Sequence, residues 1–172
     1  MLNRWRLKFL PSDFVEELDK CGNFADVFEI VKKSVEASLG IRRSGLMLYL
    51  ANLPTQIGAM YQVGSNSIIL NRVVLNAVKA LAKSRRELNS FIYTILLHEY
   101  LHSLGCIDEL ETQQLSLKIA KETFGEFHPT VKMAKNPLAY YPEIQGIGEN
   151  LAGEGELEIV KDFDRSSQRY FV

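Results

Sequence analysis

Two histidines and a glutamate stand close together in the middle of the chain, in the segment His98-Glu99-Tyr100-Leu101-His102. In a helix, residues four apart lie one turn apart on the same face, so both imidazoles can reach one metal ion. Glu99 then lies beside the metal, where it can hold a zinc-bound water and take its proton as general base. Zinc lowers the pKa of such a water towards about 7. The HExxH pattern therefore predicts a Zn²⁺ site with hydrolytic chemistry.

A zinc site usually has a third protein ligand, and the residues that follow His102 offer candidates. The pattern continues through Gly105 to Asp108 with the spacing HExxHxxGxxD. Glycine permits a sharp turn, after which the residue three positions later can return towards the metal. Asp108 is therefore the first choice for the third ligand.

Three further residues are alternatives for this ligand. Glu109 and Glu111 open a predicted helix that can pack antiparallel to the HExxH helix. His128 is the remaining one of three histidines and a better ligand type for zinc than a carboxylate. It lies beyond a predicted helix of about 16 residues, roughly 24 Å long, which would carry it away from the site.

The HExxH segment has the signals of a long, central helix. Ser84 and Glu87 have capping-box spacing at its start, and Gly105 provides its stop. Its apolar residues lie nearly all the way round, which predicts a helix buried on all sides. Two histidines and a glutamate together on a buried helix need an explanation, because unpaired polar groups there are costly. The alternative is a pair of core histidines hydrogen-bonded to their neighbours, with Glu99 in a salt bridge.

The other elements predict a mixed α+β fold: a small mixed sheet, the central helix and backing helices. Helices are expected over 11–21, 24–39, 71–81 and 108–124, a buried strand over 45–50, and a hairpin from 60–63 and 67–70. We assign residues 1–136 to a single catalytic domain. Residues 137–172 contain four glycines among acidic residues and are expected to form an irregular, mobile C-terminal extension, with a candidate strand over 155–163.

Composition excludes several classes of function. The net charge is −1, without the basic excess typical of proteins that bind nucleic acid or a membrane surface. The apolar stretches are far shorter than the roughly 20 residues of a membrane span. The first ten residues lack the apolar core of a signal peptide, and the two cysteines indicate no disulfide scaffold. We therefore expect a soluble, cytoplasmic protein.

The segment HEYLHSLGCIDE resembles the HExxHxxGxx(H/D) signature of metzincins, a group of zincin metallopeptidases. GLMLYLANLP, then IGAMYQVGSNSIILN, then the HExxH helix, is similar in order to the minimal zincins, so the resemblance covers about residues 46–109. It implies a zincin-like fold, with His98 and His102 as ligands, Glu99 as catalytic glutamate and Asp108 at the third-ligand position. A gluzincin-like arrangement would use Glu109 or Glu111 instead.

Pattern and resemblance together predict a zinc metallopeptidase that acts on a peptide or protein substrate. The hairpin over 60–70 is a candidate edge for an extended peptide to pair with by strand addition. The alternative is a zinc-stabilised binding module of the same fold that has lost turnover. A helical scaffold without metal is the third reading, and it predicts that substituting His98 affects packing alone.

Overall fold

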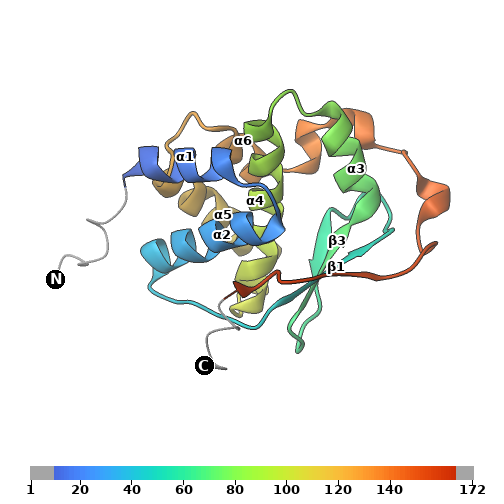
Figure 1. Cartoon of the computed structure of the whole chain (residues 1–172), viewed down its shortest axis with the longest axis horizontal. Coiled ribbons are helices and arrows are strands. Elements are labelled where there is room, and N and C mark those ends of the chain that lie inside the picture. Colours follow the sequence, from blue (N-terminus) through green and yellow to red (C-terminus); the bar gives the residue numbers. More distant parts are fainter. Residues whose placement is uncertain (1–9, 166–172) are drawn as a thin grey trace.

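The computed structural model describes residues 10–165, and over that range the fold is mixed α+β, as predicted (Figure 1). The elements in chain order are α1 (Pro11–Lys20), α2 (Phe24–Leu39), β1 (Met47–Ala51), β2 (Ala59–Tyr61), β3 (Ser67–Asn71), α3 (Arg72–Leu81), α4 (Arg85–Ser103), α5 (Glu109–Phe124), α6 (Pro129–Lys135), the 3₁₀ turns η1 (Leu138–Tyr140), η2 (Pro142–Ile144) and η3 (Glu149–Leu151), and β4 (Glu158–Val160). In Figure 1, α1, α2 and α5 gather on one side of α4, and β1, β3 and α3 lie on the other.

The sheet is small and mixed, with strand order β2-β3-β1-β4. β1 runs parallel to β3, with Leu48 opposite Ile68, while β2 is antiparallel to β3 and β4 is antiparallel to β1. The predicted hairpin is confirmed as the β2–β3 pair. β2 forms one edge of the sheet and borders the same pocket as the HExxH residues.

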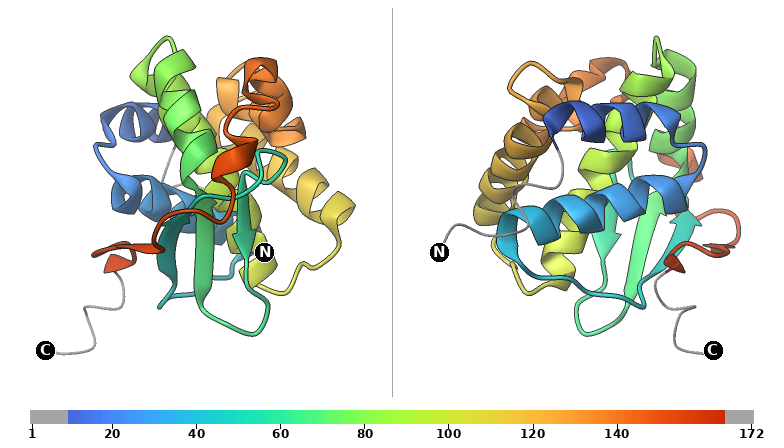
Figure 2. Two further views of the ribbon diagram at one scale, coloured as in Figure 1. Left: turned by 90° about the vertical axis from the view of Figure 1, so that its right-hand side faces the viewer. Right: turned by 60° about the vertical axis from the view of Figure 1, so that its left-hand side comes forward.

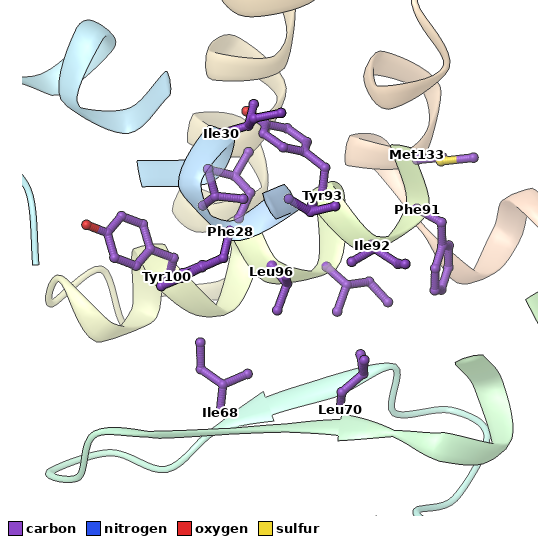
Figure 3. Close-up of a cluster of buried hydrophobic side chains, with 14 of the residues drawn as sticks. Phe28, Ile30, Ile68, Leu70, Phe91, Ile92, Tyr93, Leu96, Tyr100 and Met133 are labelled. Carbon is purple, nitrogen blue, oxygen red and sulfur yellow. The ribbon is translucent and has the colours of Figure 1, made fainter. Parts of the chain in front are cut away.

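The core lies between one face of the sheet and α4. Alternate residues of β3, Ile68 and Leu70, point from the sheet towards α4 (Figure 3). On the opposite side α2 packs on α4, where the rings of Phe28 and Tyr100 meet edge to face at 5.5 Å. α4 is therefore buried on all sides, as its sequence predicted. Although α4 is apolar along much of its length, none of the helices within residues 10–165 is long and apolar enough to cross a membrane.

Asn71 links the sheet to the loop that leads into β2. Its side-chain oxygen accepts the backbone N–H of Val73 and so caps α3, as predicted. Its amide group donates to the backbone oxygens of Leu53, Pro54 and Ile57, at 2.9, 3.1 and 2.8 Å. The side chain is fully buried, so these bonds are made without competition from water. The position of the β2 edge therefore depends on one asparagine of β3.

The segment after Pro137, expected from its glycines to extend from the domain, instead contributes to the core. Tyr141 and Ile144 belong to the main hydrophobic cluster, and Phe163 stacks on Phe28 with ring centres 4.3 Å apart. β4 adds the fourth strand of the sheet. Asp164 is buried and its carboxylate contacts the ammonium group of Lys32 at 2.7 Å. The glycines indicated an irregular backbone here, but the apolar residues on either side of them, Tyr141, Ile144 and Phe163, decide where the segment packs.

Candidate metal centre

His98, His102 and Glu109 bring three potential ligand groups together at the end of α4. The Nε2 atoms of His98 and His102 are 3.0 Å apart. One carboxylate oxygen of Glu109 lies 3.0 Å from His98 Nε2, and the other lies 3.0 Å from His102 Nε2. Ligand atoms 2.0–2.1 Å from a tetrahedral zinc ion lie roughly 3.3 Å from one another. The spacing of the three groups therefore fits one small cation.

The turn between α4 and α5 places the carboxylate of Glu109 next to the two histidines. Gly105 has φ +102°, a region that residues with a side chain rarely adopt, and it redirects the chain after α4. The carbonyl oxygen of Cys106 then accepts a hydrogen bond from His102 Nδ1 at 2.7 Å. Asp108 begins the next helix as its N-cap, so Glu109 is the first residue of α5. From this position its side chain reaches back to both histidines.

The other three candidate ligands lie outside the cluster. Asp108, the first choice from the sequence, accepts the backbone N–H of Glu111 at 2.8 Å and so directs its carboxylate to the start of α5. Glu111 is exposed in the first turn of α5, and its side chain is not part of the cluster. His128 caps α6 beyond the far end of α5 and stacks on Phe124, with ring centres 4.8 Å apart.

There is a physical reason why Glu109, rather than Asp108, lies beside the two histidines. Aspartate is among the preferred N-cap residues because its short carboxylate reaches the free N–H groups of the first turn. Glutamate is one methylene longer, and here it follows the cap, so its carboxylate remains available. The signal that could have shown this is Asp108 followed by Glu111 at capping spacing, which assigns Asp108 to the helix itself.

The hydrogen bonds of His102 suit a metal ligand. Because a carbonyl oxygen only accepts, the bond to Cys106 places a proton on Nδ1 and directs Nε2 towards His98 and Glu109. Nε2 lies 3.0 Å from a carboxylate oxygen of Glu109, and a metal ion between them would bind both atoms. A hydrogen bond from the second ring nitrogen to a backbone carbonyl is usual for a histidine that binds a metal. The residues present therefore fit a zinc ion.

The surroundings of His98 favour its neutral form, which is the form that binds metals. Burial lowers its pKa, and the neighbouring His102 acts in the same direction, while Glu109 opposes both. A neutral imidazole nitrogen is a metal ligand, whereas a protonated one is not.

Glu99 lies next to the cluster in a different environment. Its side chain is buried, with a relative exposure of 6% for the residue. Burial raises its pKa to about 7; Glu109 acts in the same direction, while His102 and a hydrogen bond from the backbone N–H of Tyr61 in β2 oppose it. Sequence reasoning did not predict the contact with Tyr61, because it depends on the sheet edge meeting α4.

Two pockets flank the cluster and share His98 and Glu109 as lining residues. The first, of about 460 Å³, lies between the β2 edge and the α4–α5 connection; its lining includes Tyr61, Val63, Glu99 and Ile107. Figure 2 shows the β2–β3 turn (green) and the α4–α5 connection (yellow) at the same end of the molecule. The second pocket, of about 410 Å³, lies between α4, α5 and the end of α6.

The outer edge of β2 is open towards this site. The N–H of Gln62 donates to Ser67, and Gly58 accepts from Asn71, so these residues face β3. Because backbone groups alternate along a strand, those of Ala59 and Tyr61 face the opposite way, towards the HExxH helix. The site thus combines a candidate metal centre, a buried carboxylate and a strand edge.

Comparisons of the chain with models of protein families, with curated proteins and with solved structures gave no match.

Proposed function

We propose that the chain is a zinc-dependent peptide hydrolase, with His98, His102 and Glu109 as metal ligands and Glu99 as general base. The observation that carries the proposal is the meeting of the three potential ligands beside Glu99, with both Glu99 and the open edge of β2 bordering one pocket. A glutamate ligand from the helix after HExxH resembles the gluzincin arrangement more than the metzincin one.

A bound zinc ion would polarise the scissile carbonyl and lower the pKa of a water molecule at the site. Glu99 would accept the proton of the attacking water on its carboxylate and pass it to the leaving amine. The backbone N–H of Tyr61 orients this carboxylate. The remaining outward backbone groups of β2, those of Ala59 and the carbonyl of Tyr61, would hold an extended peptide by strand addition, which would align the bond to be cleaved beside the cluster.

Metal content tests whether the chain binds zinc. Protein purified without chelator or histidine tag is expected to contain about one zinc per chain by elemental analysis. Absence of zinc, together with failure to take it up on addition, would reject the proposal.

Substitution of Glu99 tests whether this residue acts as the general base. Glu99→Gln should retain zinc and lower peptide cleavage by roughly 10²- to 10⁴-fold, the usual contribution of a general base. Glu111→Gln is the matched control, since Glu111 is an exposed glutamate near the site and outside the cluster. It should leave both zinc content and cleavage unchanged. Zinc without cleavage of any peptide would favour the binding module instead.

A further inference from the structure

Large apolar side chains are exposed on the walls of the pocket between β2 and the α4–α5 connection. Val63 is 74% exposed, Ile107 69% and Met60 40%, and all three line the pocket together with His98 and Glu99. Val63 lies just after β2 and Ile107 in the turn after α4, so two separate parts of the chain contribute them. Exposed apolar side chains that gather around a pocket are typical of surfaces that bind an apolar partner group.

The pocket on the other side of the cluster has a different chemistry. Its lining includes the polar side chains of Thr94, Gln113, Ser116 and Asn136, while Leu110 is its exposed large apolar residue. The two sides of the metal centre therefore differ in how many large apolar side chains they expose: Met60, Val63 and Ile107 line one pocket, and Leu110 lines the other.

Charge narrows the choice of substrate further. Neither pocket is lined by a lysine or an arginine among the described residues, and the carboxylates at the site are Glu99 and Glu109. An acidic substrate side chain would therefore find no lysine or arginine to pair with in either pocket.

We propose that the pocket between β2 and the α4–α5 connection binds a large apolar side chain of a peptide substrate, on one side of the cleaved bond only. This inference rests on the proposed peptidase function and names its substrate class. An extended peptide paired with β2 would present alternate side chains to the same face. One of them would then lie between Val63 and Ile107 and cover apolar surface that is now in water.

Cleavage of a peptide library measures the preference directly. The peptides of the library differ at one position at a time, on either side of the cleaved bond. Zinc-loaded protein should cleave peptides with Leu, Met or Phe about 10-fold faster than those with Ser or Asp at a position on one side of that bond. The double variant Val63→Ser/Ile107→Ser should lose this preference and retain its zinc and its melting temperature. The matched control is Phe127→Ser, since Phe127 is 96% exposed in the turn between α5 and α6 and lines neither pocket.

A binding measurement separates this inference from the proposed chemistry. The inactive variant Glu99→Gln should bind a fluorescent peptide with Leu at the preferred position about 10-fold more tightly than the same peptide with Ser, in fluorescence anisotropy. Adding Val63→Ser/Ile107→Ser to that variant should remove the difference. Selective binding without any cleavage by the unaltered protein would leave the inference standing and reject the hydrolase.

Three results would overturn the inference. The first is cleavage or binding without a preference for apolar side chains, and the second is an equally strong preference on both sides of the cleaved bond. The third is a dimer in sedimentation experiments that Val63→Ser/Ile107→Ser dissociates, which would make the surface a contact between two copies of the chain. In each case zinc content and Glu99-dependent cleavage could remain, so the proposed function would stand.

Discussion

His102 donates its Nδ1 proton to the carbonyl oxygen of Cys106, 2.7 Å away, and this bond turns Nε2 towards His98 and Glu109. The carbonyl lies in reach because the chain reverses at Gly105. The turn after α4 therefore orients one candidate ligand and, four residues further on, delivers another. Stability of the turn and affinity for the metal should be coupled.

Gly105→Ala tests this coupling. A side chain at φ +102° is strained, so the substitution should lower the free energy of unfolding by about 1–2 kcal/mol and weaken zinc binding. Gly40→Ala is the matched control, because Gly40 also has a positive φ of +70° and ends α2 away from the site. It should cost similar stability in chemical denaturation and leave zinc affinity, measured by competition with a chelator, unchanged. Equal affinity in the two variants would show that the turn does not position the ligands.

Glu109 and Asp108 can be distinguished as third ligands by two neutral substitutions. Glu109→Gln removes the carboxylate that contacts both histidines. Loss of a residue that only hydrogen-bonds to a metal ligand typically lowers metal affinity by roughly 10- to 100-fold, and the loss of Glu109 as a ligand should lower zinc affinity by more than this. Asp108→Asn keeps a good N-cap for α5 and should leave the affinity unchanged. The opposite result in chelator competition would restore Asp108 as the ligand.

His128 should make the fold sensitive to mild acid. Its Nδ1 accepts the backbone N–H of Thr130, and burial, together with the charge of Arg86, lowers its pKa to about 4 against the opposing effect of Asp19. The unfolded chain, with a histidine pKa near 6.5, binds the proton first as the pH falls. Stability conferred by neutral His128 is therefore complete above about pH 6.5 and declines towards pH 4, by roughly 2 kcal/mol.

His128→Asn provides the comparison for this pH dependence. Asparagine can cap α6 but does not titrate, so urea denaturation of this variant should show a shallower loss of stability between pH 6.5 and 4. Parallel curves for the two proteins would assign the acid sensitivity to other groups.

Asp164 should hold the C-terminal segment in the fold. Its carboxylate contacts the buried ammonium group of Lys32 at 2.7 Å and accepts the backbone N–H groups of Gly45 and Leu46 at 2.9 and 3.2 Å. Asp164→Asn would leave a buried lysine with less compensating charge, at a cost of about 3 kcal/mol. The control is Asp19→Asn, which disrupts the partly exposed pair with Arg86 and should cost less than about 1 kcal/mol. If thermal denaturation showed the same loss of stability for Asp164→Asn and Asp19→Asn, Asp164 would not hold the C-terminal segment in the fold.

Features that depend on neighbours in the chain were predictable from the sequence alone. The HExxH residues were expected on a buried helix that starts at Ser84 and ends near Gly105, and α4 spans Arg85–Ser103. The hairpin and the cap at Asn71 were likewise predictable. Helix periodicity, capping and turn chemistry act over a few residues, so their signals lie in short stretches of sequence.

Which of Asp108 and Glu109 lies beside the two histidines depends on the tertiary structure. Both residues follow the turn, and only the direction that each side chain takes from the start of α5 separates a helix cap from a group in the metal cluster. The contact of Glu99 with Tyr61 likewise requires β2 and α4 to meet. The final segment joins the core through Phe163 and Phe28, which are 135 positions apart in the chain. Such contacts depend on packing between distant elements, and no local pattern encodes which surfaces will meet.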